Sequence, residues 1–77
     1  MNKQRRKSIE EVIGVLDDAM STLETLSYEE QDAYDNLPES IQDSERGQAM
    51  YDNASEMQDA TSSLEEIISN LQSLIEK

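Results

Sequence analysis

The sequence predicts an all-α fold in which two long antiparallel helices form a helical hairpin that dimerises into a four-helix bundle. Apolar residues recur at alternating steps of three and four in both halves of the chain. This is the spacing of an amphipathic helix face and not of a strand. A single proline, Pro38, separates the halves. At 77 residues the chain is one domain, 1–77, and a chain of this size buries only about 60% of its unfolded surface.

The first helix is expected over residues 8–35. Ser8, followed three residues later by Glu11, has the form of a capping box. A longer helix that includes the basic segment before Ser8 stays open, although four positive charges oppose the helix dipole there. The expected apolar stripe consists of Ile9, Val12, Leu16, Ala19, Leu23, Leu26 and Ala33, with Ile13, Met20 and Tyr34 beside it. Glu30 falls on the same register, so it either drifts to solvent near the connector or pairs with Arg46.

Residues 36–43 are expected to form a connector with room for one short helical turn after Pro38. The second helix is expected over residues 44–76. Its stripe consists of Met50, Met57, Leu64 and Leu71, with Ala60, Ile67 and Leu74 between them and Ala54, Ile68 and Ile75 alongside. A connector of this length makes the helices antiparallel neighbours.

Each apolar stripe is wider than one partner helix can cover, and a lone hairpin encloses no core. A dimer of hairpins is therefore expected, with a trimer or a higher oligomer as the alternative. The connector end carries the weaker core.

The charge is strongly acidic, with 18 Asp and Glu against 6 Lys and Arg and a net charge of −12. Repulsion from phosphates disfavours direct binding to nucleic acid or to an anionic membrane surface, whereas a basic protein partner is favoured. No apolar run approaches the roughly 20 residues of a membrane span, and no apolar stretch follows the basic start. We therefore expect a cytoplasmic protein.

Catalysis is poorly supported by the composition. The chain has no His and no Cys, which removes the commonest general base and the strongest nucleophile. The metal sites of helical bundles use Glu-x-x-His pairs, which cannot occur here, and residues 32–39 lack the pattern of a calcium loop. We expect no enzymatic activity, no cofactor and no metal.

A candidate binding site surrounds the connector. Arg46 is the only basic residue between Lys7 and Lys77. Its guanidinium fork suits a carboxylate or a phosphate, and Gly47 beside it permits a close approach to backbone at a helix start. Arg46 either pins the connector to Glu39, Asp43 or Glu30, or lines an anion site together with Arg5 or Arg6 of another subunit. Within one hairpin the N-terminus lies some 40 Å from Arg46, so the second alternative requires antiparallel hairpins.

The other candidate ligand-binding residues near the connector are Tyr34, Tyr51 and Asn36. The tyrosines either pack at the rim with their hydroxyls in water or stack on a flat ligand.

The segments Met1–Lys7, "EEQDAYDNLPES" (29–40) and "SERGQ" (44–48) resemble small acidic proteins encoded by tailed phages and prophages. The resemblance extends over nearly the whole chain, but only the connector motif is specific. It implies a phage accessory protein that acts in the bacterial cytoplasm, where such proteins often counter host defence.

Two functions are consistent with these observations. The expected one is sequestration of a small anionic signalling nucleotide at the connector end of the oligomer. The alternative is an acidic inhibitor that mimics nucleic acid or occupies a basic host protein, and a structural scaffold is a further possibility.

Overall fold

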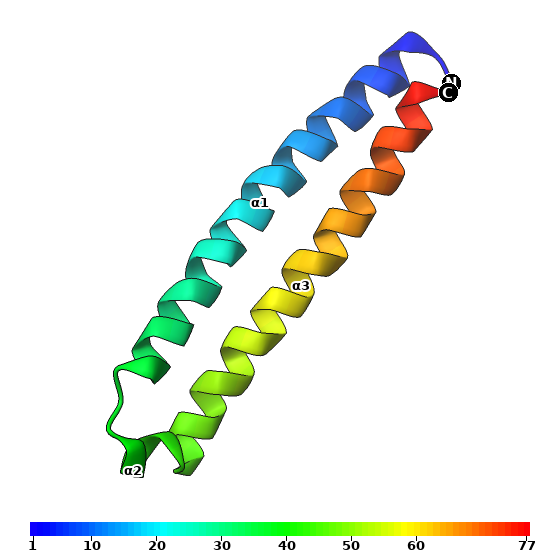
Figure 1. The fold of residues 1–77 in the computed structure, drawn as a ribbon. Helices are drawn as coiled ribbons and strands as arrows, with labels where there is room; N and C mark the ends of the chain where they lie inside the picture. Colours follow the sequence, from blue (N-terminus) through cyan, green and yellow to red (C-terminus); the bar gives the residue numbers. More distant parts are fainter.

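A computed structural model, which describes all 77 residues, shows a helical hairpin. Helix α1 spans Lys3–Asp35, the short helix α2 spans Glu39–Gln42, and α3 spans Glu45–Glu76. The long helices run antiparallel, so that both termini lie at one end and α2 lies at the other (Figure 1). The molecule is a rod with principal extents of 58 × 14 × 13 Å. The expectation of an all-α fold with two long helices is confirmed.

Helix α1 begins at Lys3, five residues before the expected start at Ser8. Asn2 is the N-cap, and its Oδ1 accepts a hydrogen bond from the Arg5 backbone N–H at 2.8 Å. Ser8 lies inside the helix and donates its hydroxyl to the Gln4 carbonyl at 3.1 Å. The capping box at Ser8 was therefore wrong. Asn caps a helix as well as Ser does, and no helix breaker lies between Asn2 and Ser8.

The connector is held by local hydrogen bonds. Pro38 is followed by the single turn of α2, for which the sequence left room. The Gln42 side-chain amide donates to the carbonyl oxygens of Tyr34 at 3.1 Å and of Asp35 at 3.5 Å, which ties α2 back to the end of α1. Ser44 caps α3 and accepts from the Gly47 N–H at 3.3 Å.

The contact between α1 and α3 follows two rows of residues on each helix, which together we call the seam. Its residues recur at steps of three and four and, together with Gln31, are the least exposed of each long helix. On α1 the seam consists of Arg6, Ile9, Ile13, Leu16, Met20, Leu23, Ser27, Glu30 and Tyr34. On α3 it consists of Gly47, Met50, Ala54, Met57, Thr61, Leu64, Ile68, Leu71 and Ile75.

One row of each expected stripe lies outside the seam. Val12, Ala19, Leu26 and Ala33 of α1, and Ala60, Ile67 and Leu74 of α3, are all exposed. The expected stripes were thus rotated by one row in both helices, because each helix has three apolar rows and a single partner helix covers only two. The rows that complete the seam are those of Ile13 in α1 and Ile68 in α3, which the sequence placed beside the stripes.

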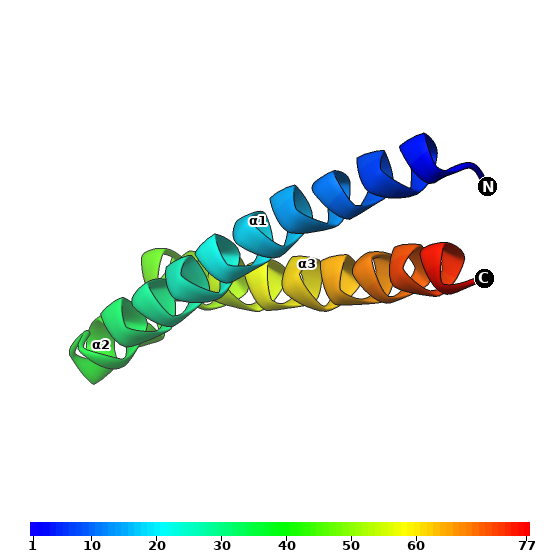
Figure 2. The ribbon, with the colours of Figure 1, turned by 90° about the horizontal axis from the view of Figure 1, so that it is seen from above.

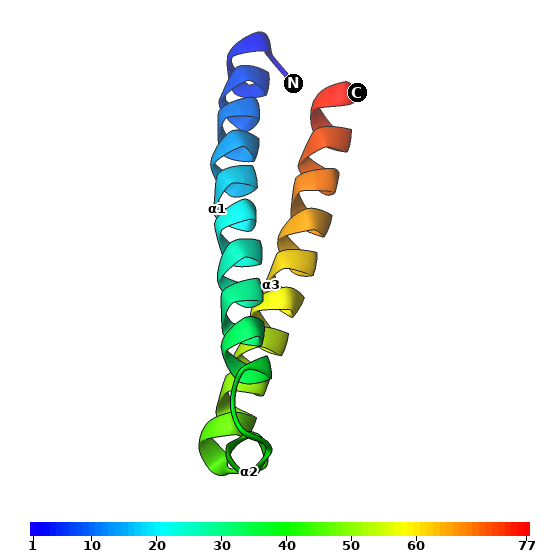
Figure 3. The ribbon, with the colours of Figure 1, turned by 60° about the vertical axis from the view of Figure 1, so that its left-hand side comes forward.

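Small side chains decide which rows face each other. Ala54 is 0% exposed, Ser27 is 2% exposed and Thr61 is 9% exposed. The Ser27 hydroxyl donates to the Glu24 carbonyl and the Thr61 hydroxyl to the Met57 carbonyl, each at 2.9 Å, so neither buried hydroxyl is left unpaired. These residues let the helices approach closely as they cross at a shallow angle (Figures 2 and 3).

The two glycines are expected to respond in opposite ways to replacement by alanine. A Cβ at Gly47 would collide with the carbonyl oxygens of Ile41 and Gln42, whereas a Cβ at Gly14 has no atom within 4 Å. We expect Gly47→Ala to destabilise the protein by about 1–3 kcal/mol through overpacking. Gly14→Ala, the matched control, should stabilise it by about 1 kcal/mol, the helix-propensity difference. Chemical unfolding followed by circular dichroism at one protein concentration measures both, and equal effects at the two sites would contradict the packing of the connector.

Candidate functional site

Arg46 lies in the first turn of α3 with its side chain exposed. It forms no side-chain hydrogen bond and no ion pair within the chain. Glu30, the more distant candidate partner, instead accepts a hydrogen bond from the Asn53 side-chain amide at 3.4 Å. The Glu30–Arg46 pair was therefore wrong, and Arg46 does not pin the connector through Glu39 or Asp43 either.

Gly47 is buried beneath the connector and does not offer open backbone to a ligand. Its missing Cβ makes room for the carbonyl groups of Ile41 and Gln42, and its N–H is taken by the Ser44 hydroxyl. The role of this glycine is to seat α2 against the start of α3.

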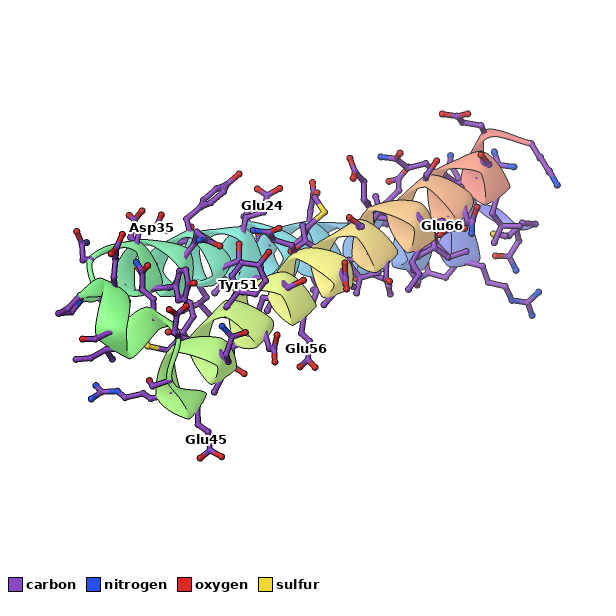
Figure 4. All side chains as sticks on the ribbon, turned by 60° about the horizontal axis from the view of Figure 1, so that its bottom comes forward. Glu24, Asp35, Glu45, Tyr51, Glu56 and Glu66 are labelled. Carbon is purple, nitrogen blue, oxygen red and sulfur yellow. The ribbon has the colours of Figure 1, made fainter.

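Tyr34 and Tyr51 form an edge-to-face pair between the long helices, with ring centroids 5.5 Å apart and an interplanar angle of 63°. Tyr51 lies toward α1, whereas Glu45 and Glu56 project from α3 away from α1 (Figure 4). Tyr51 follows Arg46 by five residues, which separates the two side chains by about 140° around the helix axis. The structure therefore does not bring Arg46 and the tyrosine pair to one surface.

The remaining candidate residues are also separate from Arg46. Asn36 is the C-cap of α1, and its side-chain amide donates to the Asp32 carbonyl at 2.9 Å. Arg5 is exposed near the N-terminus, while Arg6 lies half-buried in the seam, with its Nε buried and without a hydrogen-bond partner. Both arginines lie at the opposite end of the 58 Å rod from Arg46. One chain alone does not assemble the expected anion site.

The two sides of the seam differ in character. Because α1 and α3 are antiparallel, corresponding rows of the two helices lie on the same side of the hairpin. One side carries a polar groove lined by Glu24, Ser27, Tyr28, Gln58, Thr61, Ser62 and Glu65. The other side carries two adjoining shallow grooves whose lining includes Leu26, Glu30, Asn53, Met57 and Ala60.

We call the second side the apolar flank, and define it by the exposed rows on either side of the seam there. Its members are Val12, Ala19, Leu26 and Ala33 of α1 with Asn53, Ala60, Ile67 and Leu74 of α3. The same seven-residue spacing continues to Arg5 in α1 and to Arg46 in α3, so that an exposed arginine stands at each end of the apolar flank.

The carboxylates are spread over the outer surface. No group of three or more converges in a way that would hold a metal ion. Four exposed acids of α3 are spaced seven residues apart and line one ridge: Glu45, Asp52, Asp59 and Glu66. None of the three helices has an apolar stretch of the length that a membrane span needs.

No protein-family model, no curated protein and no solved structure was found that matches the chain. Two features of the site were missed by the sequence analysis. The first is Gln42, whose hydrogen bonds close the connector and which no local pattern marks. The second is the division of the apolar rows between seam and flank, for which the third apolar row of each helix was the available signal.

Because Arg46 has no partner within the chain and Gln42 has two, their replacement should change the free energy of unfolding by different amounts. We expect Arg46→Ala to change the free energy of unfolding by no more than about 0.5 kcal/mol, as for an unpaired surface residue. Gln42→Ala should reduce it by about 1–2 kcal/mol, because it removes hydrogen bonds to the end of α1. Thermal and urea unfolding measure both. A larger loss from Arg46→Ala than from Gln42→Ala would mean that the arginine does hold the connector.

Proposed function

We propose that the protein is a non-catalytic binding protein of the phage accessory type. It acts as a dimeric four-helix bundle in the bacterial cytoplasm and sequesters a small phosphate-bearing signalling nucleotide near the connector. The observation that carries this proposal is the position of Arg46, which is exposed at the connector end and is the one basic residue among the eight acidic residues of 29–52. Its five N–H donors are free for a ligand, and a guanidinium fork binds phosphate bidentately.

A second copy supplies the other half of the proposed site. Arg5 and Arg46 occupy equivalent rows on the same side of the hairpin, at its opposite ends. When two hairpins pack antiparallel through that side, Arg5 of one copy comes to the level of Arg46 of the other. Two guanidinium groups from different chains then clamp one phosphate group. Tyr34 and Tyr51 take no part in this site, because Tyr51 points to the other side of α3 and Tyr34 is engaged with it.

Thermal unfolding with a panel of phosphate-bearing compounds tests the proposal. The panel contains cyclic oligonucleotides, ADP-ribose and inorganic phosphate. A ligand that binds only the folded protein, present at about 100 times its Kd, stabilises it by about 2.7 kcal/mol and raises the Tm accordingly. We expect such an increase with at least one nucleotide and a much smaller one with inorganic phosphate.

Three variants distinguish binding at a defined site from nonspecific attraction of the ligand to positive charge. Arg46→Ala and Arg5→Ala should each abolish the increase in Tm. Lys7→Ala removes the same charge from an exposed position off the rows of Arg5 and Arg46, and should leave the increase intact. An equal loss with all three variants, or no increase with any nucleotide, would contradict nucleotide capture.

The acidic ridge of α3 favours a second candidate function, the occupation of a basic host protein. Its four carboxylates repeat about every 10 Å along the helix. A dimer of charge −24 and similar length would carry about one negative charge per 2.4 Å, against about one per 1.7 Å of DNA. A rod of this charge density resembles the electrostatic surface that DNA-binding proteins recognise.

Affinity capture from host lysate at two salt concentrations tests the second candidate. A partner held by charge should dissociate as the salt concentration increases, and should also be lost from the triple variant Asp52→Asn, Asp59→Asn, Glu66→Gln. Arg46→Ala should retain this partner, which distinguishes the two functions. A partner that resists both salt and the triple variant would rule out charge mimicry.

A further inference from the structure

The geometry points to the apolar flank as the surface that binds a second copy of this chain, with the two hairpins antiparallel. Large apolar side chains along it face solvent: Val12 is 49% exposed, Leu26 44%, Ile67 46% and Leu74 40%. The corresponding rows on the opposite side of the seam are polar apart from Tyr51: Glu10, Asp17, Glu24 and Gln31 in α1, and Tyr51, Gln58, Glu65 and Gln72 in α3. Only one side of the hairpin is therefore suited to burial.

The exposed area matches what a dimer would bury. A folded monomer of 8.7 kDa is expected to expose about 4,700 Å². This hairpin exposes 5688 Å², an excess of about 1,000 Å². A stable protein–protein interface takes about 800 Å² from each partner, so one contact along the flank accounts for most of the excess.

The width of the apolar stripe fits a bundle and not a solitary pair of helices. Two helices that pack only on each other need two apolar rows, whereas helices in a four-helix bundle use a third row beside them. Both long helices have that third row, and both have it on the same side. A symmetric dimer buries both at once and leaves no apolar surface for further growth.

The sizes of the side chains favour the antiparallel orientation. The Tyr34–Tyr51 and Glu30–Asn53 contacts fix the level of one helix against the other. They place two large residues, Val12 and Leu74, together near the termini, and two smaller ones, Ala33 and Asn53, together near the connector. Antiparallel hairpins set the large layer of each copy against the small layer of the other, which fills the interface evenly. Parallel hairpins would set large against large and small against small.

The charges favour the same orientation. At the terminal end, residues 1–10 and 68–77 include five basic and two acidic residues. At the connector end, residues 29–52 include eight acidic residues and one basic residue. Antiparallel packing brings each positive end to a negative end, whereas parallel packing brings like charges together.

Light scattering tests the surface. The wild-type chain should have twice its 8.7 kDa mass and a Tm that increases with protein concentration. The double variant Leu26→Glu, Ile67→Glu should be monomeric or unfolded at the same concentration. The matched variant Gln58→Glu, Gln72→Glu adds the same two charges at exposed positions on the polar side and should remain dimeric. A monomeric wild type, or a dimer that is lost equally in both variants, would overturn the proposal.

Disulfide cross-linking tests the orientation and does not require a destabilised variant, because the chain has no cysteine of its own. Antiparallel packing with full overlap places Ser63 of one copy close to Ser63 of the other, near the two-fold axis. Ser63→Cys should then form a covalent dimer on the order of ten-fold faster than Ser62→Cys, since an intramolecular contact raises the effective concentration. Ser62 lines the polar groove and points away from the flank. Equal rates for the two variants would exclude this arrangement.

The dimer does not depend on the proposed ligand. A dimer that forms and cross-links as expected, but whose Tm no nucleotide changes, would refute nucleotide capture and leave the interface standing.

Discussion

The structure depends on how three apolar rows on each helix are divided between two contacts. A single antiparallel partner helix covers two of the three rows. The two rows that are covered on each helix include the small residues Ser27, Ala54 and Thr61. Their small volumes permit a close crossing. The hydroxyl groups of Ser27 and Thr61 donate to carbonyl oxygens of their own helices, so neither buried hydroxyl is left unpaired. The third row remains outside as a consequence. The seam within one hairpin thus determines which face is left for a second hairpin.

The connector determines where Arg46 points. Gly47 admits the carbonyl groups of Ile41 and Gln42, and the Gln42 amide fastens α2 to the last turn of α1. These contacts hold the turn without an ion pair, so Arg46 has no structural partner. Arg46 lies on the same row of α3 as the apolar flank and not on the side of Tyr51. A ligand held by Arg46 must therefore lie at the edge of the flank.

The all-α fold, the two long helices and the place of the turn could be predicted from the sequence, because Pro38 and the three-four spacing are local signals. The start of α1 could not, since Asn2 and Ser8 are equally good caps and only the continuation of the helix separates them. The division of the apolar rows between the seam and the flank could not be predicted either, for a related reason. Periodicity identifies a wide apolar stripe but does not show which of its rows faces the partner helix. Close packing at Ser27 and Thr61 determines which rows do. The grouping of Arg46 with the tyrosines followed their proximity in sequence, whereas the helix turns them apart.

In the proposed dimer, charge repulsion opposes self-association, because each copy carries a charge of −12. Opposed polarity of the two ends reduces this repulsion, but the same orientation brings Arg5 of one copy toward Arg46 of the other. Two guanidinium groups repel unless an anion lies between them. An anion bound there would strengthen the contact between copies, and by thermodynamic reciprocity the dimer would bind the anion more tightly than the monomer. In this proposal the ligand is not required for the dimer to form, but its binding would add to the stability of the dimer.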